Sequence, residues 1–156
     1  MPLTFAYGSN MDFTQMRERC PSAQFVCVAI LKDHRLAFTR ISTKRNCGVS
    51  DVVVTPDAVV WGVVYEVTEY DLAVLDVKEG YRPSRPAEDN SYNRRAETIF
   101  QNGDETKPLN VEIYFAVPQA NPPLPNQTYK DLIVNGAKHW NLPADYIAEL
   151  EAIEIS

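Results

Sequence analysis

The chain has 156 residues, and its 15 Lys and Arg stand against 21 Asp and Glu, which gives a formal net charge of −6. Its length predicts one domain over residues 1–156, and 45% hydrophobic with 23% charged residues excludes a disordered chain, a collagen and a coiled coil. The negative balance predicts no nucleic-acid partner and no anionic membrane surface, because both attract basic surfaces.

The chain shows no targeting, membrane or metal signal. Its start has no charged segment followed by an apolar one, and no apolar run approaches the roughly 20 residues of a membrane span. Cys20, Cys27 and Cys47 are odd in number and lack CxxC spacing, and with the two histidines they form no zinc motif. We therefore expect free thiols, with Cys27 in the core, no metal, and a reducing, cytoplasmic location.

The elements predicted in chain order are mostly strands. Turn formers Gly8-Ser9-Asn10 end the first strand, and residues 11–19 favour one or two helical turns. Continuous apolar residues at 59–65 predict a strand covered on both faces. The first strand is predicted over 3–7, and the last two over 92–100 and 109–117. Between them, 24–38 is predicted as two strands with a break at Lys32–Arg35. Two further strands are predicted over 52–55 and 59–67, with Pro56-Asp57 as the turn that separates them.

Three helices are predicted from local signals. Thr68 and Asp71 resemble a capping box at the start of a helix over 69–78, which Gly80 would end. Two more helices are predicted over 129–138 and 143–153, the second with Pro143 in its first turn. The order predicts an α+β fold, in which five to seven strands form a strongly twisted sheet or small barrel with helices outside.

Glu79 is the first candidate for chemistry. Leu72, Leu75 and Glu79 share one helix face, and the leucines indicate that this face is turned inward. An inward carboxylate loses hydration, which raises its pKa and makes it a better base. The alternative is that Glu79 frays into solvent or pairs with Arg82. Asp76 and Lys78 lie off this face and are expected to be solvated.

The second candidate is the turn Tyr7–Asn10. Glycine allows close approach to a ligand, and successive backbone N–H groups can hold a carboxylate or an oxyanion. The alternative is a plain strand-to-helix turn in which Asn10 caps the helical turns after it. Ser9 lacks a GxSxG context, which disfavours it as a nucleophile.

Two further sites are ambiguous. Tyr129 begins a helical stripe of buried type and is either a core aromatic or part of a pocket, while Gly136-Ala137 would let that helix approach another element closely. Arg94 and Arg95 are expected on opposite faces of a strand, and either could hold a substrate carboxylate.

Four stretches in order resemble the γ-glutamylcyclotransferase family and span nearly the whole chain. They are Phe5–Asn10; Pro21-Ser22-Ala23 leading into 25–36; 60–64 through Leu75-Asp76 to Glu79-Gly80; and Tyr129-Lys130 through Gly136-Ala137-Lys138 to Leu142-Pro143 and Tyr146. The resemblance implies a small mixed β-barrel with peripheral helices, one active site and no cofactor. It also implies cleavage of a small-molecule γ-glutamyl compound to 5-oxoproline and a free amine or amino acid, by a monomer or homodimer.

The resemblance also implies roles for individual residues. The acid/base glutamate of the family falls on Glu79. The substrate-binding residues fall on Phe5, Ala6, Tyr7, Gly8, Ser9, Asn10 and Tyr129.

The chain departs from the family pattern at Thr4 and in the long polar segment 82–91. Because of these departures, the resemblance does not determine which group the reaction releases from the glutamyl unit. That group could be an amino acid, an amine, an isopeptide lysine or part of a natural product, with segment 82–91 setting specificity. A different class of function is a non-catalytic small-molecule-binding domain on the same fold.

Overall fold

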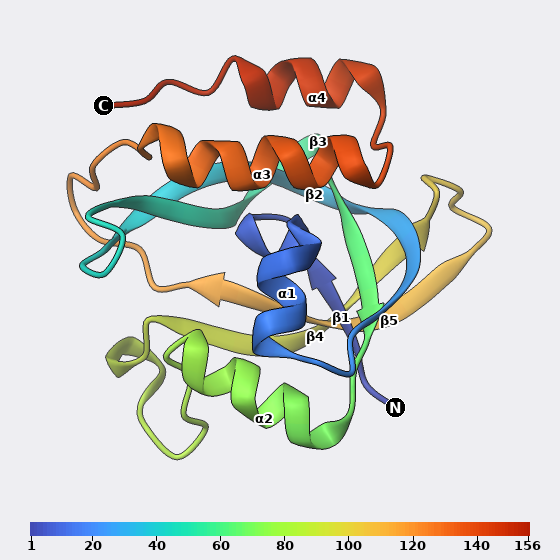
Figure 1. Cartoon of the computed structure of the whole chain (residues 1–156), viewed down its shortest axis with the longest axis horizontal. Coiled ribbons are helices and arrows are strands. Elements are labelled where there is room, and N and C mark those ends of the chain that lie inside the picture. The colour runs from blue at the N-terminus through green and yellow to red at the C-terminus, as the bar shows by residue number, and fades with distance from the viewer.

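The computed structural model of the protein describes all 156 residues as a five-stranded barrel surrounded by helices (Figure 1). None of its helices has the length and apolar character needed to cross a membrane. The elements are β1 (Leu3–Ala6), η1 (Ser9–Met11), α1 (Phe13–Arg19), β2 (Gln24–Ser42), β3 (Cys47–Glu66), α2 (Glu69–Lys78), η2 (Ala87–Asp89), β4 (Tyr92–Gln101), β5 (Pro108–Ala116), α3 (Gln127–His139) and α4 (Ala144–Glu151).

The barrel is closed and mixed, with strand order β1-β3-β2-β4-β5. β1 runs antiparallel to β3 and pairs in parallel with β5 through Thr4 and Glu112, which closes the sheet. In Figure 1, α3 and α4 lie over one side of the barrel, and α2 lies on the opposite side. The predicted α+β barrel with outer helices is confirmed, at the lower end of the expected strand number.

The two predicted breaks in the central strands are wrong. β2 and β3 form one long antiparallel hairpin, in which Asp33 and Asp57 adopt positive φ angles of 58° and 66°. The Asp57 N–H donates to Asp33 Oδ1 at 3.0 Å, and the register shifts between Lys32 and His34. Aspartate tolerates the left-handed region, and a bulge absorbs extra residues while the ladder continues. Residues typical of a turn therefore mark an irregularity inside the hairpin.

β3 separates two cores, as its apolar run predicts. Val60 and Val64 belong to a cluster with Ile99 and Ile113, while Val63 packs with side chains of the surrounding helices. A strand covered on both faces needs apolar residues at successive positions. All three cysteines are free and buried, and Cys27 lies in the core as expected.

Helix α2 begins and ends where the sequence predicts. The Thr68 hydroxyl accepts a hydrogen bond from the Asp71 N–H at 3.1 Å, and Gly80 after the helix has φ of +68°. The Asp71 carboxylate does not return to the cap; it accepts the Ser22 N–H at 2.8 Å and also the Ser22 hydroxyl. Leu72 and Leu75 are buried, so the helix has a fixed rotation about its axis.

Candidate active site

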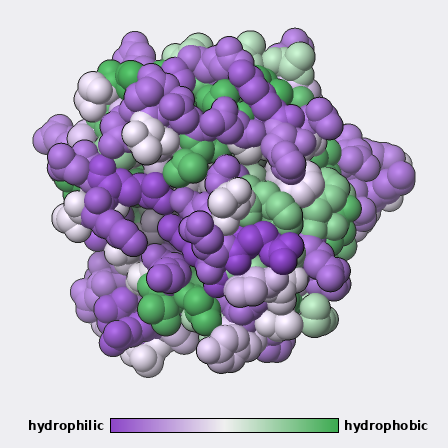
Figure 2. All heavy atoms as spheres, in the orientation of Figure 1, coloured by the Kyte–Doolittle hydropathy of each residue, from purple (hydrophilic) through white to green (hydrophobic).

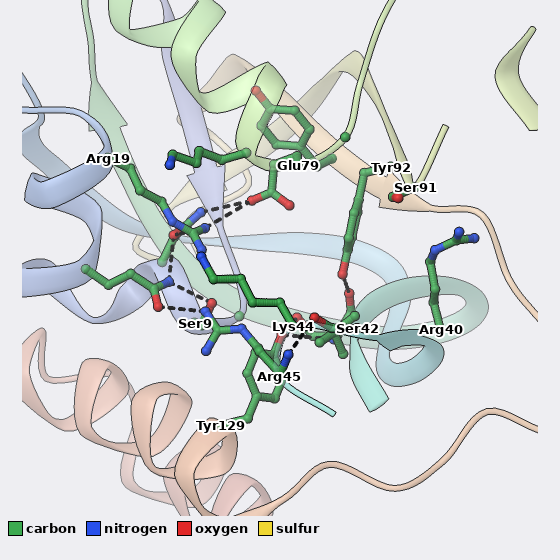
Figure 3. A pocket seen from close by; sticks show the side chains of 18 of the residues that line it. Ser9, Arg19, Arg40, Ser42, Lys44, Arg45, Glu79, Ser91, Tyr92 and Tyr129 are labelled. Atoms are coloured by element: carbon green, nitrogen blue, oxygen red, sulfur yellow. Dashed lines mark hydrogen bonds and ion pairs between the residues drawn. The ribbon is translucent and has the colours of Figure 1, made fainter. Parts of the chain in front are cut away.

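A cavity of about 830 Å³ opens between the β1–η1 turn, α1, the tip of the β2–β3 hairpin and the end of α2. Figure 3 shows Glu79 on one side of it and Arg45 and Tyr129 on the other, with the Lys44 side chain running from the hairpin tip toward Arg19. The predicted catalytic Glu79 and all seven predicted substrate-binding residues lie on its lining, the latter being Phe5, Ala6, Tyr7, Gly8, Ser9, Asn10 and Tyr129. Three regions far apart in the chain therefore share one cavity.

Glu79 comes directly after the last residue of α2, and its side chain is 16% exposed. Asn10 Nδ2 donates to Glu79 Oε1 at 3.2 Å, and Arg19 Nη1 lies 3.6 Å from the same oxygen. Burial raises the pKa of Glu79 above its ordinary value, against the opposing effects of the Arg19 charge and the Asn10 hydrogen bond. The carboxylate faces inward, and its ionic partner is Arg19 rather than Arg82.

The orientation of the Asn10 amide is fixed by two donors. Asn10 Oδ1 accepts hydrogen bonds from Gln15 Nε2 at 2.9 Å and Arg19 Nη1 at 3.0 Å, which leaves the amide nitrogen for Glu79. Gln15 Nε2 also donates to the Ser9 hydroxyl at 2.8 Å. The alternative that Asn10 caps α1 is wrong, because Asp12 accepts the Gln15 N–H as the cap.

The β1–η1 turn is held from its carbonyl side. The Tyr65 hydroxyl donates to the Asn10 carbonyl at 2.9 Å, and Trp140 Nε1 donates to the Met11 carbonyl at 3.0 Å. The backbone N–H groups of Gly8, Ser9 and Asn10 have no acceptor within the chain. A fixed turn with free N–H groups can hold an anionic or developing negative oxygen.

Tyr129 combines both interpretations of its helical stripe, since it is 3% exposed and its hydroxyl lies on the cavity. That hydroxyl accepts the Ser50 N–H at 3.0 Å and shares a hydrogen bond with Ser50 Oγ at 2.8 Å. A Cβ on Gly8 would lie 2.2 Å from Ser50 Oγ, so a side chain there requires Ser50 to move. The β1–η1 turn, β3 and α3 therefore meet at Ser50.

The remaining predicted residues form walls of the cavity. Phe5 and Ala6 lie in buried strand β1, and the Tyr7 hydroxyl donates to the Tyr114 carbonyl at 2.6 Å. Burial raises the pKa of Tyr7 and Tyr129, so both remain neutral hydrogen-bonding groups at physiological pH.

The expectation that Asp76 is solvated is wrong. Arg94 Nε lies 2.8 Å from Asp76 Oδ1, and the Tyr114 hydroxyl donates to the same oxygen at 2.6 Å. Arg95 lies against the Phe115 ring, with its guanidinium carbon 3.5 Å from the ring centroid. Neither arginine lines the cavity, and the Arg94 guanidinium is already paired with the Asp76 carboxylate of α2.

Sequence reasoning missed the side chains that α1 and the β2–β3 hairpin bring to the cavity. Gln15 and Arg19 lie four residues apart on α1, and Arg40, Lys44 and Arg45 fall within six residues of the hairpin. That short basic stretch is the signal that could have found them. From segment 82–91, only Ser91 reaches the lining. No cluster of three or more His, Cys, Asp or Glu side chains is placed to hold a metal ion.

Comparisons with known proteins agree with this arrangement. A model of the AIG2-like family matches residues 59–150. Gamma-glutamylcyclotransferases of human and mouse are 33% and 32% identical, over 97% of this chain and 78% of theirs. A solved gamma-glutamyl cyclotransferase structure has a TM-score of 0.88 at 30% identity, covering 99% of this chain and 89% of that one. The chain therefore belongs to the AIG2-like, γ-glutamylcyclotransferase family.

Proposed function

We propose that the protein is a γ-glutamylcyclotransferase, which converts a γ-glutamyl compound to 5-oxoproline and a free amino acid or amine, with Glu79 as general acid and base. The observation that carries the proposal is the shared cavity, in which the Glu79 carboxylate meets Asn10 of the β1–η1 turn at 3.2 Å. The similarity to named γ-glutamylcyclotransferases over 97% of the chain supports it.

The reaction is an internal aminolysis. The α-amine nitrogen of the glutamyl unit attacks its δ-carbonyl carbon, the new C–N bond closes the lactam, and the C–N bond to the released amine breaks. Both reacting groups belong to one molecule, so the site must mainly fold the glutamyl chain into a reactive conformation. The α-amine is mostly protonated at neutral pH. Glu79 removes its proton and later gives one to the leaving nitrogen.

The two carboxylate oxygens of Glu79 have different tasks in this mechanism. Oε1 accepts from Asn10 and lies beside Arg19, whereas Oε2 accepts no hydrogen bond within the chain. Oε2 is therefore the atom that exchanges protons with substrate. The raised pKa of Glu79 strengthens it as a base, because a desolvated carboxylate gains more from binding a proton.

The substrate-binding residues are assigned from the same cavity. The free N–H groups of Gly8, Ser9 and Asn10 hold the carbonyl oxygen as it gains charge, or the substrate's α-carboxylate. Phe5, Ala6 and Tyr7 shape the pocket, and Tyr129 closes its far side.

A panel of γ-glutamyl compounds tests the proposal by release of 5-oxoproline. The panel contains γ-glutamyl amino acids, glutathione, a γ-glutamyl amine and a γ-glutamyl isopeptide of lysine. We expect release from at least one class, and the preferred class decides between amino acid and amine as leaving group. Binding without release from any compound would favour the non-catalytic binding domain and contradict the proposal.

Tyr129→Phe is expected to fold, to lose about 1–3 kcal/mol of stability and to raise the Michaelis constant. Its hydroxyl accepts the buried Ser50 N–H, which would be left unsatisfied. Thermal unfolding and steady-state kinetics measure both effects. Tyr70→Phe, an exposed tyrosine on α2, is the matched control. An unchanged Michaelis constant would reduce Tyr129 to a packing residue.

The raised pKa of Glu79 also predicts a pH dependence of stability. The folded protein holds the Glu79 proton to higher pH than the unfolded chain, so the free energy of unfolding falls as pH rises between the two pKa values. Gln cannot ionise, so Glu79→Gln should gain melting temperature over wild type as pH rises from the ordinary pKa of a glutamate through the raised pKa of Glu79. Thermal unfolding across this range is the measurement, and a difference that grows toward acid pH would contradict it.

The wider setting belongs to the same proposal. Residues 1–156 act as one domain, a monomer or homodimer, on free small molecules of glutathione metabolism in the cytoplasm, without nucleic acid, membrane or cofactor. The free buried thiols and the net charge of −6 support this setting.

A further inference from the structure

A single side chain of α1, Gln15, joins three parts of the cavity through the two ends of its amide group. Gln15 Nε2 donates hydrogen bonds to the Ser9 hydroxyl at 2.8 Å and to Asn10 Oδ1 at 2.9 Å. Gln15 Oε1 accepts a hydrogen bond from Arg45 Nη2, at the tip of the β2–β3 hairpin, at 2.8 Å. Both N–H groups and the oxygen of the amide therefore have partners within the chain.

The row of hydrogen bonds from Arg45 to Glu79 has a direction that its two ends determine. Arginine only donates and an ionised carboxylate only accepts, so an oxygen must face Arg45 and a nitrogen must face Glu79. With its oxygen toward Arg45, Gln15 presents its nitrogen to Asn10. With its oxygen toward Gln15, Asn10 presents its nitrogen to Glu79 Oε1, at 3.2 Å. The orientation of the Gln15 amide therefore determines which atom of Asn10 meets the carboxylate.

The fold holds this row at its Arg45 end. Helix α1 lies at the front of the barrel in Figure 1, on a face where hydrophilic side chains predominate (Figure 2). Gln15 and Asn10 are partly exposed, so water competes for their hydrogen bonds. The Arg45 carbonyl accepts Asn126 Nδ2 at 3.1 Å, and the Arg45 guanidinium lies 5.0 Å from the Tyr129 ring centroid. An amide anchored to Arg45 keeps its orientation where an unanchored one is free to turn over.

Arg19 supports the same orientation of Asn10, because its Nη1 donates to Asn10 Oδ1 at 3.0 Å. Loss of the Gln15 amide would therefore remove one of two donors to that oxygen. A carboxylate at position 15 would do more, because it would place an acceptor against Asn10 Oδ1. The Asn10 amide would then gain by turning its nitrogen toward position 15, and its oxygen would face Glu79.

The orientation of Asn10 matters for the ionised form of Glu79, which is the form that accepts the substrate proton. Burial raises the pKa of Glu79, whereas the Arg19 charge and the Asn10 hydrogen bond lower it. The charges of Arg45 and Asp76 have smaller effects, downward and upward respectively. An Asn10 oxygen against Oε1 would replace a stabilising donor by a repelling acceptor, so less of the base would be ionised at a given pH.

We propose that Gln15 is a positioning residue of the reaction, which directs the Asn10 amide nitrogen to Glu79 Oε1 and so keeps the carboxylate ready to accept the substrate proton at Oε2. This role rests on the proposed cyclotransferase function. It extends the active site to α1 and, through Arg45, to the tip of the β2–β3 hairpin.

Gln15→Glu and Gln15→Met test the role, because both side chains are close to glutamine in size. Glutamate accepts hydrogen bonds without donating, and methionine is at most a weak acceptor. We expect Gln15→Glu to lower kcat for 5-oxoproline release by about 10–100-fold with little change in KM, as for loss of a hydrogen bond to a charged group. Gln15→Met should lose less, because Arg19 still donates to Asn10 Oδ1.

The pH profile of kcat is a readout that a packing role would not move. Its acid limb reports the ionisation of Glu79 in the substrate complex. We expect this limb at higher pH in Gln15→Glu than in wild type, because the Asn10 hydrogen bond that lowers the pKa of Glu79 is lost. The other charged side chains on the lining are unchanged in these variants: Glu18, Arg40, Lys44 and Lys78.

Thr14→Glu is the matched control for the added charge. Thr14 is the exposed neighbour of Gln15 on α1 and does not line the cavity. The variant should leave kcat and the acid limb near wild type, because its carboxylate does not replace a donor to Asn10.

The outcomes separate this role from the function beneath it. A wild-type kcat and acid limb in Gln15→Glu, or equal changes in Thr14→Glu, would overturn the positioning role while the cyclotransferase function stands. If Gln15→Glu does not fold by circular dichroism, Gln15→Met decides: a lower kcat at constant KM supports the role, and an unchanged kcat overturns it. No 5-oxoproline from wild type with any compound of the panel would instead overturn the function itself.

Discussion

Glu79→Gln is expected to fold and to lose about 10²–10⁴-fold in the rate of 5-oxoproline release. Glutamine has nearly the same shape, and its side-chain oxygen can still accept the hydrogen bond that Asn10 Nδ2 donates to Glu79 Oε1. It cannot take a proton from the substrate α-amine, because an amide is not basic at neutral pH. The substrate should still bind, so the loss should appear in kcat.

Glu69→Gln is the matched control for this experiment. Glu69 lies on the same helix, is exposed and does not line the cavity, so the same change of charge should leave turnover near wild type. Circular dichroism and thermal unfolding establish that both variants are folded. Wild-type turnover by Glu79→Gln would remove Glu79 from the chemistry.

Gly136→Ala is expected to lose about 1–3 kcal/mol of stability. Helix propensity alone favours alanine by about 0.8–1.0 kcal/mol, so the sign depends on packing. A Cβ on Gly136 would lie 2.4 Å from the Met11 carbonyl carbon and 2.6 Å from the Asp12 nitrogen. Both atoms are backbone and cannot rotate away, so we expect the clash to outweigh the propensity.

The same substitution should weaken activity, because Met11 belongs to η1, which also carries Asn10. Asn135→Ala is the control: Asn135 is the exposed neighbour on α3, where alanine should be neutral or slightly stabilising. Thermal unfolding and kcat/KM of both variants are the measurements. A more stable Gly136→Ala would show that α3 and η1 separate easily.

Local signals in the sequence were most informative where a single side chain decides the structure. The Thr68 hydroxyl needs only the N–H three residues later, so the start of α2 was predictable. The close approach of α3 at Gly136 was likewise expected from the absence of a side chain. Asp33 and Asp57 misled the strand prediction, because the same positive φ serves a turn or a bulge and only the partner strand decides between them.

Charged side chains were predicted less well than apolar ones. Leu72 and Leu75 are buried as their spacing predicts. Asp76, which lies off their face, was expected in solvent but pairs with Arg94 of β4. A helical pattern shows which face meets the core, but it carries no information on which strand lies along the edge of that face.

The sequence by itself determined the α+β class, the order of the elements, the inward face of α2 and the candidate residues Glu79 and Tyr7–Asn10. These depend on periodicity, caps and turn formers, which act within a few residues of one another. Only the tertiary structure decided that Asn10 meets Glu79, that Tyr129 meets Ser50, and that Arg40 and Lys44 reach the same cavity. Barrel closure joins β1 to both β3 and β5, so contacts across 69 or more residues result from strand pairing, which no local pattern encodes.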